Sequence, residues 1–198
     1  MLHIDSILRN KKNNRSNPAN TLHDTPDLSV HERKQSIAMM RINHSGEVCA
    51  QALYQGQALV ARSSSQYQAL MQASQEEVDH LAWCQERLKE LQGHTSLLNP
   101  VWYAGSFGIG VIAGLAGDEI SLGFLAETEH QVTKHLEKHL NAMSNNDQKS
   151  RAILEQMRLD EMQHATAAEQ AGAANLPTLV KMCMNTTSKI MTSLAALF

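Results

Sequence analysis

Two stretches of this chain repeat one arrangement, a single glutamate followed after about 30 residues by the sequence Glu-x-x-His. The six residues are Glu47, Glu77, His80, Glu129, Glu161 and His164. A Glu and a His three positions apart point the same way from a helix. A lone Glu on one helix and Glu-x-x-His on the next, given twice, is the ligand set of two-metal carboxylate sites in four-helix bundles. The repeat therefore predicts an all-α bundle whose central helices share a metal centre.

The composition agrees with an all-α fold. Glycines number 10 and prolines 4 in 198 residues, aromatic residues make up 4%, and helix-forming residues dominate the rest. A chain of this length can bury the core of one domain. Its net charge of -3 gives no reason to expect a nucleic-acid partner.

Apolar periodicity and helix-capping residues divide the chain into a tail and one domain. Residues 1–28 are polar and are predicted to be a flexible N-terminal tail, and residues 29–198 form the helical domain. The sequence from Ser29 to Glu32 has the spacing of a capping box, and Gly93 fits a helix stop. We expect helices over residues 29–62, from the turn at 63–65 to residue 92, over 118–141 and 147–171, and from about residue 177 onward.

Two glutamates compete for one ligand position on the helix predicted over residues 118–141. Glu129 shares a helical face with Leu125 and Leu136, whereas Glu127 shares one with Lys134. A metal ligand must face the core, so the helical phase selects Glu129.

The residue types indicate which metal the site prefers. We expect Glu77 and Glu161 to bridge two ions, with Glu47 and Glu129 each capping one ion and His80 and His164 each binding one. Four carboxylates and two imidazoles suit iron or manganese better than a metal that selects thiolates. Buried carboxylates also need compensating charge, which the metal supplies.

Four further residues are candidates for supporting the ligands. Asp160 is placed to accept a hydrogen bond from His80 across the bundle, and Glu76 to do the same for His164. Tyr54, two turns after Glu47, is a candidate hydrogen-bonding or redox group. His44, one turn before Glu47, either supports a ligand or occupies an ordinary polar helix position.

The remaining histidines of the third long helix suggest no ligand role. His130, His135 and His139 are expected on a solvated or partly buried face.

Residues 95–117 carry no charged side chain. Their length meets the criterion for a transmembrane helix, but a span would leave the two halves of the ligand set on opposite sides of a membrane. We therefore expect an apolar crossover helix that lies against a membrane or is buried in the protein. The last helix mixes apolar residues with Lys181 and Lys189, and no acidic residue follows Glu169, as in amphipathic helices that lie at a membrane surface.

The three cysteines form no Cys-x-x-Cys pair, and the N-terminus lacks the apolar stretch of a secretory signal. We expect reduced thiols and an intracellular protein.

The residues between Arg41 and Gln57, Arg-Ile-Asn-His-Ser-Gly-Glu-Val-Cys-Ala-Gln-Ala-Leu-Tyr-Gln-Gly-Gln, resemble the first-helix signature of the demethoxyubiquinone hydroxylases. The Glu77–His80 pair, a glycine-rich segment with Asp118-Glu119, the sequence Ala126–Glu129 and the sequence Asp160–His164 follow in that family's order. The resemblance covers nearly all of residues 29–198.

The resemblance implies a ferritin-like di-iron monooxygenase that hydroxylates the ring of a polyprenyl methoxy-benzoquinone in ubiquinone biosynthesis. It implies two Fe ions per chain on the same six residues, O2 as oxidant and NADH as ultimate electron donor. It also implies a peripheral protein of the cell membrane, on its cytoplasmic face in bacteria, and allows a lipid-presenting partner protein. The alternatives are a ferritin-like iron-storage or peroxide-scavenging protein and a non-catalytic lipid-binding bundle with a structural metal.

Overall fold

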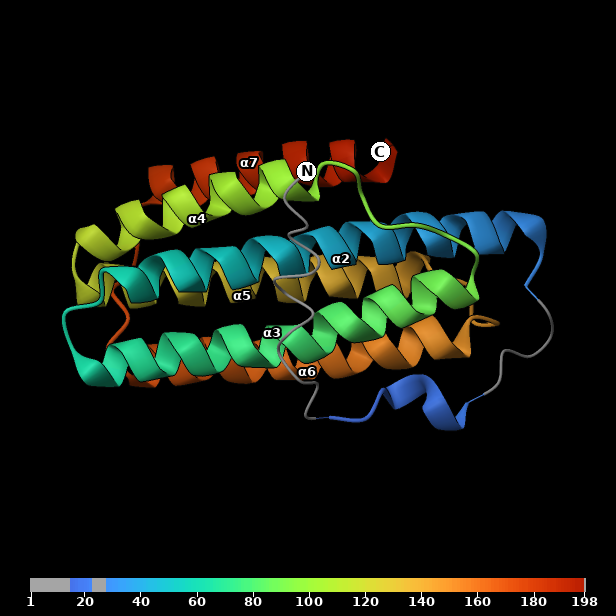
Figure 1. The fold of residues 1–198 in the computed structure, drawn as a ribbon, viewed down its shortest axis with the longest axis horizontal. Coiled ribbons are helices and arrows are strands. Elements are labelled where there is room, and N and C mark those ends of the chain that lie inside the picture. The colour runs from blue at the N-terminus through green and yellow to red at the C-terminus, as the bar shows by residue number, and fades with distance from the viewer. Residues whose placement is uncertain (1–14, 23–27, 198) are drawn as a thin grey trace.

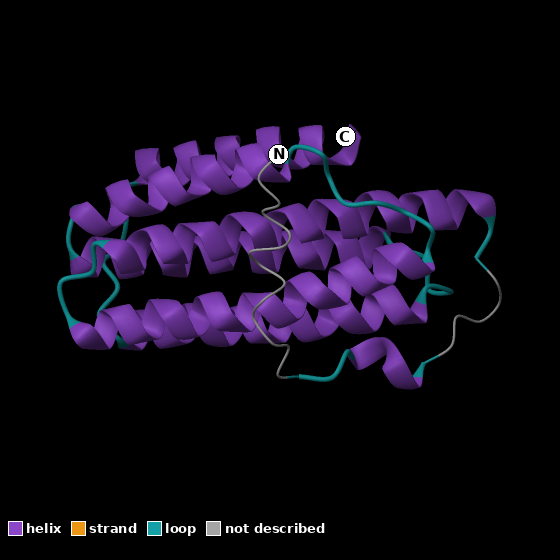
Figure 2. Cartoon of the chain, in the orientation of Figure 1, coloured by secondary structure: helices purple, strands orange, loops and turns teal. Residues whose placement is uncertain are grey.

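The computed structural model describes residues 15–22 and 28–197, and it assigns them to helices and loops without a strand (Figure 2). The helices are the 3-10 helix η1 (Pro18–Thr21), α2 (Val30–Leu59), α3 (Ser64–Glu90), α4 (Asn99–Leu115), α5 (Asp118–Ala142), α6 (Gln148–Gln170) and α7 (Thr178–Leu197). The predicted all-α class is confirmed.

Four long helices form a bundle of two hairpins, α2 with α3 and α5 with α6 (Figure 1). The helices α4 and α7 form an additional layer that contacts α2 and α5, and η1 lies on α6 at the other side. The α4 helix connects the two hairpins, as the expected crossover helix does. The bundle therefore has an outer helical layer on its α2–α5 side and a short N-terminal segment on its α3–α6 side.

The first long helix begins where its capping residues require. The Ser29 amide donates to Glu32 Oε2 at 2.8 Å, and the Glu32 amide donates to Ser29 Oγ at 3.3 Å. This reciprocal pair satisfies two amide groups that the first helical turn leaves free. The predicted capping box is confirmed.

The end of α3 differs from the prediction in its mechanism. The residue with left-handed backbone is Gln92, with φ 61°, and the Gly93 amide donates to the Leu88 carbonyl at 2.7 Å. A side chain on Gly93 would come within 2.8 Å of Ile37 Cγ2. Gly93 is therefore suited to close packing against α2, and Gln92 makes the turn that ends the helix.

The crossover helix packs closely against α2 through glycines. A Cβ on Gly110 would collide with the Leu53 carbonyl oxygen, and a Cβ on Gly56 would collide with the Phe107 carbonyl oxygen. The two backbones touch where these side chains are missing. Within the described residues, no helix has the length and hydropathy needed to cross a membrane.

The segment before α2 departs from the predicted tail over residues 15–22. These residues contact the bundle, because Arg15 pairs with Asp160 at 2.7 Å, Asn17 Nδ2 donates to Glu86 at 2.8 Å, and Ala19 is buried. The rest of the predicted tail, residues 1–14 and 23–27, lies outside the described residues.

The two larger apolar clusters of the core lie on either side of a polar layer along the helices. One cluster contains Met40, Trp83, Leu88, Leu136, Ile153 and Met157. The other contains Leu53, Tyr54, Leu70, Ala73, Leu125 and Ala168. In each helix the candidate ligands fall between the residues of the two clusters, so the packing of both clusters holds the polar layer in place.

Candidate metal centre

Each helix of the bundle contributes ligands to the polar layer. They are Glu47 from α2, Glu77 and His80 from α3, Glu129 from α5, and Glu161 and His164 from α6. All are buried except His164, which is partly exposed. The structure brings these six residues together at the middle of the bundle.

The six residues form two overlapping groups, each with ligand atoms within 4.8 Å of one another. The His80 half contains Glu47, Glu77, His80 and Glu161, and the His164 half contains Glu77, Glu129, Glu161 and His164. Glu77 and Glu161 belong to both. A pair of carboxylates shared by two groups is the arrangement that bridges two metal ions.

In the His80 half, the imidazole directs one nitrogen to the carboxylates. His80 Nδ1 lies 3.1 Å from Glu77 Oε2, 3.1 Å from Glu161 Oε1 and 3.6 Å from Glu47 Oε2. His80 Nε2 lies 2.9 Å from Asp160 Oδ2. If Nε2 carries a proton and donates it to Asp160, Nδ1 is left with a lone pair for a metal.

The His164 half repeats this geometry. His164 Nδ1 lies 3.1 Å from Glu161 Oε2, 3.7 Å from Glu77 Oε1 and 3.9 Å from Glu129 Oε1. His164 Nε2 forms a short contact with Glu76. The Tyr54 hydroxyl donates to Glu129.

The two halves differ in solvent exposure. The side chains of His80 and Asp160 are 0% and 9% exposed, whereas those of His164 and Glu76 are 11% and 34% exposed. The His164 half is therefore nearer to solvent on this side.

Burial and mutual repulsion make the ionised carboxylates of this layer costly. Burial raises the pKa of Glu47 and of Glu129 well above the usual range, and neighbouring carboxylates raise both further. Although burial lowers the pKa of His80 and of His164, their carboxylate partners raise both, that of His164 to about 12. For Glu161 burial acts upward, but the bonds from His164 and His80 leave its pKa lowered.

Two buried carboxylate oxygens, Glu77 Oε1 and Glu129 Oε2, have no hydrogen-bond partner. Such oxygens are costly to bury unless a donor or a metal satisfies them. These oxygens, the six converging ligand atoms and the hard-oxygen and imidazole donor set fit a pair of iron or manganese ions.

The structure separates the two competing glutamates of α5 as their helical phase predicts. Glu129 points into the core, whereas Glu127 is partly exposed and pairs with Lys181 at 3.0 Å. Only Glu129 belongs to a group of ligands.

His44 belongs to neither of the two ligand groups. It is buried, and its Nδ1 lies 3.3 Å from Asn99 Nδ2, while Ser45 Oγ donates to Asn99 Oδ1 at 2.9 Å. These contacts tie α2 to the start of α4. His44 is thus a buried polar residue of α2, and its role in supporting a ligand stays a prediction.

The other histidines of α5 divide between surface and interior. His130 is exposed and lies 2.8 Å from Glu169. The rings of His135 and His139 are 4.1 Å apart and partly buried. Burial lowers the pKa of His135 to about 4 and that of His139 to about 3. Both rings are thus neutral at pH 7.

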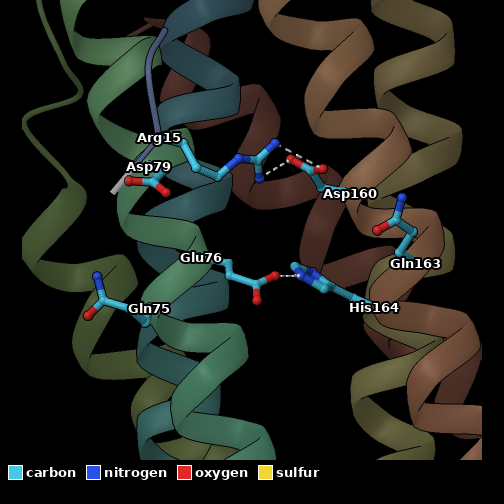
Figure 3. A pocket seen from close by; sticks show the side chains of 7 residues that line it. All are labelled: Arg15, Gln75, Glu76, Asp79, Asp160, Gln163 and His164. Carbon is cyan, nitrogen blue, oxygen red and sulfur yellow. Dashed lines mark hydrogen bonds and ion pairs between the residues drawn. The ribbon is translucent and has the colours of Figure 1, made fainter. Parts of the chain in front are cut away.

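Two cavities lie beside the metal centre. A mainly apolar groove of about 480 Å³ lies among α2, α4, α5 and α7, and its lining includes Glu47, Leu53, Trp102, Phe124, His135 and Met191. A polar pocket of about 410 Å³ is lined by Arg15, Gln75, Glu76, Asp79, Asp160, Gln163 and His164 (Figure 3).

Sequence reasoning missed Arg15, which contacts the partner of a candidate ligand. It lies 145 positions from Asp160 in the chain, in a polar segment without periodicity, so no spacing signal connects the two.

Comparisons with known proteins identify the family of the chain. The family model described as ubiquinone biosynthesis protein COQ7 matches residues 34–195. A 3-demethoxyubiquinol 3-hydroxylase of Polynucleobacter necessarius is 52% identical over 97% of this chain and 92% of that protein. One of Chromobacterium violaceum is 58% identical over 84% and 81%, respectively.

Among solved structures, the bacterioferritin-related protein of Bacteroides fragilis, a dodecameric thioferritin, matches with a TM-score of 0.55 and 16% identity. The match covers 70% of this chain and 84% of that one, and it shows that the fold is ferritin-like. By the extent of the family match and the identity to these relatives, the chain belongs to the COQ7 family of ubiquinone biosynthesis proteins.

Proposed function

We propose that this protein is a di-iron monooxygenase that hydroxylates the ring of a polyprenyl methoxy-benzoquinol with O2. The observation that carries the proposal is the pair of ligand groups joined by Glu77 and Glu161, together with an apolar groove that reaches Glu47. The names of the relatives support the substrate class. Two iron ions bound to the six residues would supply the activation of O2.

The groove supplies a place for the substrate. Its volume of about 480 Å³ is within the usual range for small-molecule sites. Glu47 and Asn43 put polar groups at the α2 wall, whereas Val101, Ile109 and Phe124 present apolar surface. We place the quinol ring beside Glu47 and the polyprenyl chain between α4 and α7, where apolar side chains shield it from water.

The quinol form closes the electron balance without a bound reductant. One oxygen atom of O2 enters the ring as a hydroxyl group and the other leaves as water. The quinol gives up two hydrogen atoms and becomes a quinone, which provides the two electrons required. NADH is then the ultimate donor, acting by reducing the quinone. The described residues contain no strand that would support a dinucleotide-binding motif.

The outer layer supports binding to a membrane surface. Apolar side chains are exposed on both of its helices, namely Val101, Ile112 and Leu115 of α4 and Leu179, Met182 and Ile190 of α7. The α7 helix carries Lys181 and Lys189 and no acidic residue, as expected beside anionic lipids. We propose a peripheral protein on the cytoplasmic face of the cell membrane, to which a lipid-presenting partner can deliver substrate.

Quinone analysis by mass spectrometry tests this function. Cells lacking the protein should accumulate the demethoxy precursor. Wild type and Glu155→Ala should clear it, because Glu155 is an exposed glutamate of α6 paired with Arg158. Glu161→Ala should not. Normal ubiquinone in the deletion strain, without a second hydroxylase, would contradict the proposal and favour iron storage or peroxide removal.

A further inference from the structure

The N-terminal segment of residues 15–22 lies over the side of the bundle that faces away from the groove. It is attached at three points. Asn17 Nδ2 donates to Glu86 on α3 at 2.8 Å, Ala19 is buried in the apolar cluster that contains Trp83, and Arg15 reaches Asp160 on α6. The segment therefore bridges the two helices that carry the Glu-x-x-His pairs.

Arg15 donates hydrogen bonds to both carboxylate oxygens of Asp160. Its guanidinium nitrogens donate to Asp160 Oδ2 at 2.7 Å and to Asp160 Oδ1 at 3.2 Å (Figure 3). The guanidinium carbon also lies 5.0 Å from the centre of the Trp83 ring. A bidentate pair of this kind restricts the orientation of the carboxylate as well as its position.

Asp160 in turn is the partner of a candidate metal ligand. It faces His80 Nε2 at 2.9 Å and accepts from Gln156 Nε2 at 2.9 Å. With both oxygens of Asp160 held by Arg15, the carboxylate cannot rotate away from the imidazole. His80 Nδ1 then stays directed at Glu77 and Glu161.

In the part of the chain that the structure describes, the His164 half has no bidentate arginine pair of this kind. Glu76, the partner of His164, accepts from the amide of Gln72 at 3.1 Å, and no arginine pairs with it among the described ion pairs. Its side chain is also more exposed than that of Asp160. The bidentate guanidinium contact is therefore one feature that distinguishes the two halves.

We propose that Arg15 is a positioning residue for the His80 half of the metal centre, acting through Asp160 to hold the imidazole of His80 against the shared carboxylates. This inference rests on the proposed function, since it takes His80 as a metal ligand. The contact also places a segment outside the four-helix bundle in direct support of the site.

The full-length protein is freed of metal and reloaded with Co(II). The test measures how fast the Co(II) is released, monitored by chelator competition and by the visible absorption of the bound ions. We compare wild type, Arg15→Ala and Arg15→Lys. The matched control is Arg158→Ala, which removes an arginine of α6 whose near partner is the exposed Glu155. Circular dichroism and thermal unfolding establish that each variant is folded.

Wild type should bind two Co(II) ions per chain. Arg15→Ala should release one of them about tenfold faster, the scale of losses when a ligand's supporting partner is removed, and should change the absorption of that ion. Arg15→Lys should restore part of the retention, because lysine keeps the charge without the bidentate grip. Arg158→Ala should behave as wild type does.

A double-mutant cycle tests whether Arg15 acts on His80 through Asp160. In the Asp160→Asn background, Arg15→Ala should have no further effect, because its route to His80 is already broken. Unchanged release and absorption in Arg15→Ala would overturn the inference and leave the metal centre standing. An undiminished effect in the Asp160→Asn background would also overturn it. A wild-type protein that binds no Co(II) would overturn the proposed metal centre and this inference with it.

Discussion

The His80 half of the candidate metal centre is shielded on its polar side, whereas the His164 half borders the polar pocket. His80 is fully buried, and Arg15 covers its partner Asp160. His164 lines the pocket directly, beside the more exposed Glu76 (Figure 3). On the opposite side the order reverses, because Glu47 of the His80 half lines the apolar groove and Glu129 is absent from its lining.

The comparison shows that two halves with the same types of ligand can differ in which cavity they border. Each half combines one carboxylate of its own with one histidine and the two shared carboxylates. In the His80 half, Glu47 lines the proposed substrate groove and His80 does not line the polar pocket. In the His164 half, the Tyr54 hydroxyl donates to Glu129. Variants in matched pairs can test whether the two halves also differ in function.

The largest effect is expected at the residues that the halves share. Glu77→Ala or Glu161→Ala removes a ligand from both groups, so both ions should be lost and hydroxylation should fall by more than about 100-fold. Iron content of the purified variants, measured by mass spectrometry, checks this result, with Glu155→Ala as control. Retention of two ions by either variant would refute the bridging role.

The next largest effect should be confined to one half. Glu129→Gln should weaken binding of one ion by at least about 100-fold, because an amide is a poor substitute for a charged ligand. Glu47→Gln should do the same for the other ion. Metal titration of each variant distinguishes them from Glu127→Gln, whose side chain pairs with Lys181 and should leave both ions in place. Equal losses in Glu127→Gln and Glu129→Gln would reject the assignment.

A smaller and unequal effect is expected at the two supporting carboxylates. Asp160→Asn should accelerate metal release by about 10-fold to 100-fold, and Glu76→Gln by about tenfold or less. The effects should differ because the Asp160 side chain is more buried than that of Glu76 and is paired with Arg15. Release of iron to a chelator measures both. Equal rates in the two variants would show that the halves are supported alike.

The smallest effect is expected on the free energy of unfolding at acidic pH, and it comes from two histidines that are not candidate ligands. Burial lowers the pKa of His135 and His139 to about 4 and about 3. A lowered pKa means that the unfolded chain binds protons first, so stability is complete above about pH 6.5 and is lost as the pH falls toward 4. Between about pH 6.5 and 5.5 the pair should cost about 1 kcal/mol after allowance for partial exposure.

Denaturant unfolding of the metal-free protein at these two pH values measures this loss of stability. The double variant His135→Gln/His139→Gln should lose less stability on acidification than wild type does. An identical loss would place the acid sensitivity in the carboxylates of the metal centre instead.

Local sequence signals predicted most of the helical framework and the convergence of the candidate ligands. The capping box of Ser29 and Glu32 located the start of α2 within one residue. The helical phase of Glu129 distinguished it from Glu127, because a period of 3.6 residues determines which side faces the core. The Glu-x-x-His spacing identified Asp160 and Glu76 as partners, since they lie one position before a ligand on the opposing helix of the bundle.

The missed features depend on contacts between segments that are distant in the chain. Arg15 meets Asp160 only after α6 is in place, and buried His44 contacts Asn99, which is 55 positions away at the start of α4. Gly93 was predicted to end a helix, but its lack of a side chain is needed for contact with Ile37. Tertiary packing decides such positions, and it leaves no periodic signal in the sequence.

The most direct test of the two-half centre is anomalous diffraction at the iron edge from crystals of the iron-loaded protein. Two peaks are predicted, one beside Glu47 and His80 and the other beside Glu129 and His164, with Glu77 and Glu161 between them. A single peak, or iron bound away from these six residues, would contradict the account.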